Sequence, residues 1–238
     1  NTEPKDMYLS RVAALNAGIS NTAPAMNVNR LCGSGLQAIV SVFQTLMMED
    51  ADFGLAGGSE NMSRSPHIIP DARWGRKMGD TTLTDMMIGA LTCPFGTGHM
   101  GVTAENVANE HQISRQEQDH FASESQKKAQ IAIKTGKFKE QIIPIEVRKR
   151  KEIVLFDTDE HPKETTVEIL SNLPTVFKKD GTVTAGNSSG INDGAAALVL
   201  GTQSAISRNK LEPIAKILGY AQTGVRPEIM GIGPISAV

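Results

Sequence analysis

The chain has 238 residues, a formal net charge of -2 at pH 7 and two cysteines. This length allows one large domain or two ordinary ones with a substantial core, and a charge so near zero gives no reason to expect a nucleic-acid partner. Two cysteines are too few for a disulfide framework, so a reducing compartment is expected, which we take to be the cytoplasm.

The first 60 residues alternate between helix and strand patterns. Residues 7–17 predict a helix closed by Gly18, residues 24–31 a short strand, and residues 53–58 an apolar strand that ends in glycines. This alternation predicts a parallel sheet buried on both faces. Residues 1–6 lack the basic leader and apolar core of a signal peptide, and without an initiator Met they are expected to be an internal starting point.

Cys32 lies between an expected strand and an expected helix, where helix-terminal N–H groups and the helix dipole favour a thiolate. Gly33 and Gly35 permit a tight turn there. The helix is marked by apolar residues at helical spacing, namely Leu36, Ile39, Val40, Phe43, Leu46 and Met47. The stretch from Leu31 to Met48 has no charge but is too polar for a lipid-facing span, so we expect no membrane partner and a helix covered on all sides by protein. A buried structural cysteine is the alternative interpretation of Cys32.

The middle of the chain changes character. Residues 60–100 are rich in Met, Gly, Pro and Asp and predict an irregular segment with short helices. Ser114 to Glu117 is a capping-box pattern that opens a helix ending at Gly136. Residues 140–147 and 152–156 alternate in the way that strands do.

The α/β pattern returns near the end of the chain. Two apolar runs, residues 194–200 and 214–220, predict strands. Residues 61–186 are therefore interpreted as an insertion between two sections of one sheet domain. The basic run at residues 148–151 is interpreted as a solvated strand or loop edge, not as a localisation signal.

Five segments, in family order, resemble segments of thiolases. They are Asn29–Gly35, Ala56–Ser63, His99–Asn106, Thr184–Ala196 and Met230–Pro234. The resemblance is closest to the acetyl-CoA acetyltransferase and β-ketothiolase branch. It implies an α/β, thiolase-like layered α-β-α fold with an inserted α+β loop domain.

The resemblance also implies a division of the chain. Residues 1–60 would be the first part of the N-terminal half with the nucleophile helix, 61–186 the loop domain, 187–222 the last part of that half, and 223–238 the start of the C-terminal half. The start of the first half and most of the second would be missing, including a Gly-His-Pro histidine and a Cys-x-Gly-Gly-Gly cysteine, because neither string occurs here. General acid–base steps contribute roughly 10²–10⁴-fold each, so this chain alone is expected to be nearly inactive.

Thiolases take an acyl group from a coenzyme A thioester onto a cysteine and pass it to a second acyl-CoA or to CoA. The resemblance therefore implies an acyl-CoA C-acyltransferase that makes or thiolytically cleaves 3-ketoacyl-CoA, and Cys32 matches its nucleophile. Acyl-CoA would be the substrate, with no covalently bound cofactor and no metal site. Thiolases are dimers or tetramers, so the other expected partner is a second copy of the protein.

Eight further residues match positions that bind substrate or CoA in the family: His99, Met100, Leu91, Phe177, Ala185, Ser189, Gly190 and Met230. The histidine is expected near the thioester, the methionines and the phenylalanine in the acyl pocket, and the serine–glycine pair beside the pantetheine amide. Without the resemblance, His99 would be interpreted as a surface imidazole and the Met and Phe residues as core. Cys93 is interpreted as a spectator thiol, and Asn187, Asn192 and Asp193 as turn-formers.

Three other functions fit the residues less well. The first is a non-catalytic CoA-binding or oligomerisation fragment of a thiolase. A β-ketoacyl synthase is disfavoured by the long insertion at residues 61–186 and by the His99-Met100-Gly101 segment. A cysteine hydrolase is weaker still, because no local His/Asp arrangement accompanies Cys32.

Overall fold

The computed structural model describes residues 3–75 and 77–238. Asn1, Thr2 and Arg76, which fall inside the predicted segments 1–60 and 61–186, lie outside the described residues. The chain divides into two compact units, each of which is described by itself.

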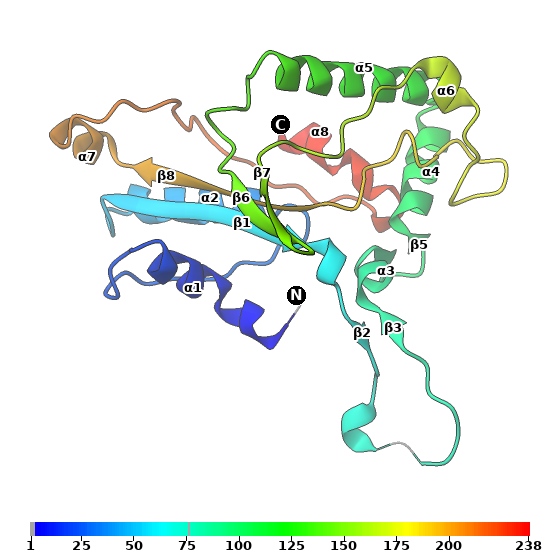
Figure 1. The fold of residues 1–238 in the computed structure, drawn as a ribbon, viewed down its shortest axis with the longest axis horizontal. Coiled ribbons are helices and arrows are strands. Elements are labelled where there is room, and N and C mark those ends of the chain that lie inside the picture. Colours follow the sequence, from blue (N-terminus) through cyan, green and yellow to red (C-terminus); the bar gives the residue numbers. More distant parts are fainter. Residues whose placement is uncertain (1–2, 76) are drawn as a thin grey trace. The chain divides into compact units, whose positions relative to one another are not determined.

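The first unit comprises Asn1–Ala90, Ile191–Thr223 and Ser236–Val238. It mixes helices with short sheets, as Figure 1 shows. Its elements are η1 (Pro4–Tyr8), α1 (Leu9–Asn16), α2 (Ser34–Met47), β1 (Phe53–Asn61), η2 (Met62–Arg64), β2 (His67–Ile68), η3 (Ala72–Trp74), β3 (Thr84–Asp85), α3 (Met86–Ala90), β8 (Asp193–Gly201) and α7 (Gln203–Arg208).

The second unit comprises Leu91–Gly190 and Gly224–Ile235. Its elements are β4 (Thr92–Cys93), β5 (Gly98–His99), α4 (Met100–Glu110), α5 (Arg115–Lys134), β6 (Ile145–Lys149), β7 (Glu152–Phe156), α6 (Val167–Ser171) and η4 (Pro227–Ile232). The short helix α8 (Gly233–Ala237) follows η4. Helix α4 packs against η4, and α5 packs against α6.

The prediction of a parallel sheet buried on both faces is wrong. β1 and β8 pair antiparallel over their full length, from Phe53 opposite Gly201 to Asn61 opposite Asp193. All four sheets within the described ranges are two-stranded and antiparallel. The two strands approach closely at the centre, where a Cβ on Gly57 would lie 2.8 Å from the carbonyl oxygen of Ala196. The side chains of β8 are mostly exposed.

Two predicted strands do not form. Residues 24–31 run without a partner strand, and the side chain of Asn27 donates instead to the carbonyls of Asp6 and Met7 at 3.1 and 2.9 Å. Residues 214–220 have no regular structure, and Ile214 is fully exposed. An extended segment becomes a strand only where a neighbour satisfies its N–H and C=O groups, which an apolar pattern alone does not ensure.

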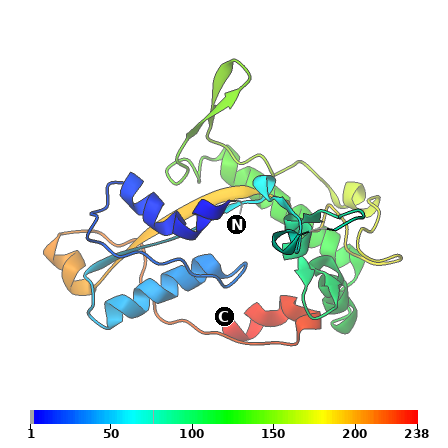
Figure 2. The same ribbon diagram turned by 90° about the horizontal axis from the view of Figure 1, so that it is seen from below.

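The predicted helix after Cys32 is present as α2, but it is not covered on all sides. Leu46 is buried, whereas Leu36 and Met47 are 73% and 67% exposed. One face of α2 lies along β1, as Figure 2 shows, and Val42 contacts the strand so closely that Gly54 has no room for a side chain. Within the part of the chain that the structure describes, the helix without charged residues is covered on one face only.

Two predictions that rest on residues close together in the chain, a helix and an exposed hairpin, agree with the structure. The helix opened by the capping box is confirmed as α5, which ends just before Gly136, whose φ is +72°. The strand predicted at residues 140–147 begins later, at Ile145, and runs into the basic residues. It pairs with β7, and all residues of this hairpin are exposed, which confirms the solvated edge. The hairpin stands away from the helices of its unit (Figure 2).

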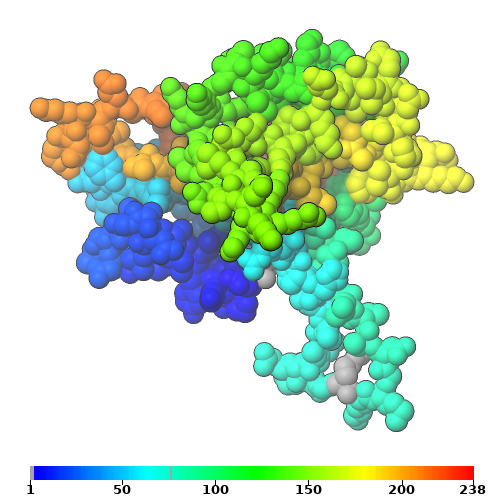
Figure 3. Space-filling model, in the orientation of Figure 1, coloured from blue at the N-terminus to red at the C-terminus, as the bar shows by residue number. Residues whose placement is uncertain are grey.

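The predicted irregular segment after β1 is also present. The β2–β3 pair is only two residues long on each side, and the loop between its strands extends outward with Trp74 and Met78 exposed (Figure 3). Among the residues described, no helix combines the length and apolar character needed to cross a bilayer. The division into residues 1–60, 61–186, 187–222 and 223–238 stays a prediction.

Candidate functional site

Cys32 stands at the end of a tight turn in the first unit and is exposed. The turn is held by short local bonds: the Asn29 side chain accepts from the Leu31 N–H at 2.9 Å, and the Ser34 hydroxyl accepts from the Arg30 N–H at 2.9 Å. The same hydroxyl donates to the Leu31 carbonyl at 2.7 Å. Because Cys32 is exposed, it is not the buried structural cysteine of the alternative interpretation.

Leu31, directly before this cysteine, has φ +49°, in the left-handed region that costs a non-glycine residue about 1–2 kcal/mol. Its side chain is 79% exposed, so burial within the described residues does not offset that cost. The following helix then starts at Ser34, close to β1: a Cβ on Gly58 would lie 3.4 Å from the Gly35 Cα. The turn therefore presents a thiol at the start of a helix that lies against a strand.

All eight predicted substrate positions lie in the second unit, where His99 opens α4. Its Nδ1 accepts a hydrogen bond from the Gly101 N–H at 3.0 Å. In the neutral ring the proton is then on Nε2, which makes that nitrogen the available donor. The ring stacks on Phe177 with centroids 4.7 Å apart and planes 13° apart. His99 is half-buried, so it is not a surface imidazole.

Leu91 and Met100 lie beside this ring pair, and Met230 lies on a neighbouring element. His99 pairs with Thr92 in the short β4–β5 sheet. The Met100 N–H donates to the Leu91 carbonyl at 2.7 Å, which places both residues beside the histidine. Met230 is 44% exposed on η4, the element that packs against α4. The structure thus groups Leu91, His99, Met100 and Phe177 closely, with Met230 on the neighbouring element.

The other predicted residues lie on the loop at 182–190, in the same unit. Thr184 is completely buried, whereas Ala185 and Ser189 are exposed and Gly190 is intermediate. The loop therefore turns a buried side toward the helices and presents the predicted CoA-contacting side chains outward.

Sequence reasoning missed the groups that hold this loop. Glu105 and Asp119, 4% and 1% exposed, both accept hydrogen bonds from it. The only available signal was the spacing of Arg115 and Asp119, four residues apart on a helix, which matches an ion pair observed at 2.7 Å. Asn187, interpreted as a turn-former, bonds to Asp119 at 2.9 Å.

Cys93 differs from Cys32 in its exposure to solvent. It is only 6% exposed, in β4. The hydrogen bond from the Thr97 side chain, followed by that from the Phe95 backbone, lowers the pKa of its thiol. Burial nevertheless keeps reagents away from it. Across the described ranges, no group of three His, Cys, Asp or Glu residues could hold a metal ion.

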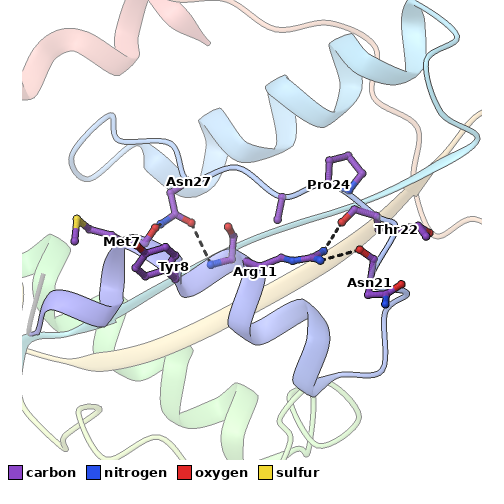
Figure 4. Close-up of a pocket in the computed structure, with 10 residues that line it drawn as sticks. Met7, Tyr8, Arg11, Asn21, Thr22, Pro24 and Asn27 are labelled. Atoms are coloured by element: carbon purple, nitrogen blue, oxygen red, sulfur yellow. Dashed lines mark hydrogen bonds between the residues drawn. The ribbon is translucent and has the colours of Figure 1, made fainter.

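A hollow in the first unit is lined by residues of η1, α1 and the loop at 21–27 (Figure 4). The Arg11 guanidinium donates to the carbonyls of Ala23 and Asn21 at 2.5 and 2.8 Å, and Asn27 accepts from the Ser10 N–H at 3.1 Å. These hydrogen bonds fasten the loop at 21–27 to α1.

Comparison with known proteins gives one consistent family. The thiolase N-terminal domain family matches residues 1–204. The chain is 55% identical to the beta-ketothiolase BktB of Cupriavidus necator over 238 residues, which is 99% of this chain and 60% of that protein. It is 44% identical to the acetyl-CoA acetyltransferase of Syntrophomonas wolfei over 96% of this chain and 59% of that protein.

Solved structures agree. Human mitochondrial 3-ketoacyl-CoA thiolase superposes with a TM-score of 0.95 at 42% identity, covering 99% of this chain and 60% of that one. The same enzyme in complex with CoA gives 0.94 at 42% identity, covering 99% and 59%. The chain thus spans about 60% of the length of the relatives it matches. The predicted α/β thiolase-like fold is confirmed.

Proposed function

This chain belongs to the thiolase family, and from that membership we propose that the whole protein is an acyl-CoA C-acyltransferase. It makes or thiolytically cleaves 3-ketoacyl-CoA through an acyl group carried on Cys32. The observation that carries the proposal is the exposed Cys32 thiol at the strained turn into α2.

The turn suits a nucleophile. The Cys32 thiolate adds to the thioester carbonyl, the carbon–sulfur bond to CoA breaks, and the acyl group remains on Sγ while CoA leaves as a thiol after taking up a proton. The Cys32 backbone N–H is the proposed donor to the negative charge that develops on the carbonyl oxygen, because the Gly33 and Ser34 N–H groups already donate to the Arg30 and Leu31 carbonyls at 3.0 Å. A second acyl-CoA, as its enolate, or free CoA then takes the acyl group away. A reactive group on a rigid helix start is well placed for both steps.

The second unit supplies the proposed substrate contacts. The His99 Nε2–H is a hydrogen-bond donor for the thioester region, and the exposed Ser189 with the adjacent Gly190 lies beside the pantetheine amide. Leu91 and Ala185 contact the CoA moiety. Met100, Phe177 and Met230 line the acyl pocket. The stacked aromatic pair and the ordered loop support these roles, because both present fixed polar groups beside apolar side chains.

We extend the proposal to the setting of the enzyme. Residues 61–186 act as a loop domain between residues 1–60 and 187–222 of the N-terminal half, and residues 223–238 open the C-terminal half. The protein is a cytoplasmic homodimer or homotetramer that uses CoA thioesters as substrates and holds no covalent cofactor.

Alkylation of the full-length protein tests the nucleophile. Iodoacetamide should label Cys32, and acetyl-CoA present beforehand should slow that labelling because an acylated sulfur cannot be alkylated. The buried Cys93 is the internal control, and it should react only after unfolding. Cys32→Ser should leave the fold intact and abolish thiolysis. Labelling of Cys93 with Cys32 untouched, or thiolysis by Cys32→Ser, would refute the assignment.

A further inference from the structure

Two buried carboxylates in the second unit hold the loop at 182–190. The first, Glu105 on α4, accepts hydrogen bonds from the Thr182 N–H at 2.8 and 2.9 Å and from the Thr182 hydroxyl at 3.0 Å. It also accepts from the Val183 N–H at 2.8 Å. A buried carboxylate is tolerated only where such donors replace water, so each partner fixes the other.

The second carboxylate, Asp119 on α5, holds the middle of the loop. One of its oxygens accepts from the Arg115 Nε at 2.7 Å, and the other accepts from the Asn187 side-chain amide at 2.9 Å. Another nitrogen of the guanidinium donates to two backbone carbonyls at and just after the end of α6. Asp119 is 1% exposed, and its side chain connects two helices to the loop.

The Asn187 side chain passes this restraint to the loop backbone. Its oxygen accepts from the Thr184 N–H at 2.7 Å, and its amide nitrogen also donates to the Thr182 carbonyl at 3.1 Å. The buried Thr184 hydroxyl accepts from the Gly186 and Asn187 N–H groups at 3.2 and 3.3 Å. The Ser188 hydroxyl donates to the Thr184 carbonyl at 2.6 Å.

This part of the loop has no regular helix or strand. Apart from the β-bridge between Thr184 and Thr175, side-chain bonds determine its shape. These bonds end at Ser188, one residue before Ser189. We infer that Glu105, Asp119 and Asn187 are positioning residues, which fix the loop so that Ser189 and Gly190 meet the pantetheine arm of an acyl-CoA. The inference rests on the proposed function, since those two residues have their contact role only there.

The pair Asp119 and Asn187 can be tested by exchange in the full-length protein. Asn187→Asp places a second carboxylate about 2.9 Å from the first, so the two repel and the loop is displaced. Adding Asp119→Asn restores a donor opposite an acceptor: the amide at 119 donates to the carboxylate at 187 and accepts from Arg115. The carboxylate at 187 still accepts from the Thr184 N–H. Its other oxygen faces the Thr182 carbonyl, 3.1 Å away, with no proton between them, and the single and double variants share this unfavourable contact.

The measurement is alkylation of Cys32 by iodoacetamide at rising acetyl-CoA concentration, because it separates ligand positioning from general damage. Asn187→Asp should raise the acetyl-CoA concentration for half-protection at least tenfold, while the rate without acetyl-CoA stays within twofold of wild type. The exchanged double variant should return half-protection to within about threefold. Glu124→Gln is the matched control: it changes a carboxylate on the same helix whose side chain is 43% exposed and pairs with Lys127 at 3.7 Å, and it should leave the curve unchanged.

Half-protection at the wild-type concentration in Asn187→Asp would overturn the inference. A double variant that does not recover protection would also overturn the inference, even if it folds better than Asn187→Asp. The two residues would then not act through the hydrogen bond between them. A wild-type protein whose Cys32 is alkylated equally fast at every acetyl-CoA concentration would give a different result: it would overturn the proposed function, and this inference with it.

Discussion

Replacing Gly101 with alanine sets two opposite effects against each other at the start of α4. Gly101 is buried, and its N–H donates to His99. A Cβ there would lie less than 3.0 Å from three atoms of the Phe177 ring. That ring is stacked on His99, and its segment is tied down by a β-bridge between Thr175 and Thr184. The ring therefore cannot move aside without giving up contacts.

The balance of these effects favours destabilisation. Alanine is better than glycine in a helix by about 1 kcal/mol. Overpacking a fixed site costs about 1–3 kcal/mol, and separating a stacked ring pair removes about 0.5–1.5 kcal/mol more. We therefore expect Gly101→Ala to lower the free energy of unfolding by about 2 kcal/mol. In a Phe177→Ala background the clash is gone, and the same substitution should raise that free energy by up to about 1 kcal/mol.

Urea unfolding of the full-length protein and its variants measures these differences, provided that the slopes stay equal. The sign reversal corresponds to a coupling of about 3 kcal/mol between positions 101 and 177. Gly89→Ala is the matched control, because Gly89 is also helical but has no atom within 4 Å of its would-be Cβ; it should be neutral or stabilising. A Gly101→Ala protein as stable as wild type, or effects that add within about 0.5 kcal/mol, would contradict the close contact.

Three further predictions concern local hydrogen bonds and strain. The Ser63 hydroxyl and N–H lower the pKa of Asp193. The stability that these bonds supply is therefore present above the unfolded-state pKa of about 3.9 and is lost as the pH falls through the folded-state pKa. The difference in the free energy of unfolding between wild type and Ser63→Ala should shrink below about pH 4. Ser114→Ala should cost about 1 kcal/mol by removing the N-cap of α5 and should raise the pKa of Glu117, as measured by NMR, because the Ser114 hydroxyl is what chiefly lowers it. Leu31→Gly should raise the free energy of unfolding by about 1 kcal/mol, and with it the melting temperature, because glycine adopts the positive φ at this exposed position without strain. A lower melting temperature would show that the leucine side chain stabilises the fold.

The parts of the fold that could be predicted from the sequence are those with short-range causes. The capping box at Ser114 and the glycine at 136 mark both ends of α5, because both act within one helical turn. The apolar spacing after Cys32 likewise predicts α2 nearly to the residue. Each of these signals involves residues close in the chain, so no knowledge of distant partners is needed.

The strands could not be predicted in the same way. The direction of β1 depends on β8, whose residues lie more than a hundred positions later, and an alternating or apolar run does not show whether its neighbour is parallel or antiparallel. Residues 24–31 and 214–220 have strand-like patterns and no partner strand among the described residues. Pairing is a non-local property, and it was the least predictable feature of this chain.

The same distinction separates the two parts of the candidate site. The turn at Cys32 is held by bonds spanning two to four residues, so its sequence motif largely specifies its geometry. The loop that carries Ser189 is held by bonds from Asp119 and Glu105, 68 and 77 residues away in the chain. A loop with an intact motif can therefore be displaced by a change in α4 or α5. Substitutions of Glu105 or Asp119 should accordingly alter ligand binding without altering the intrinsic reactivity of Cys32.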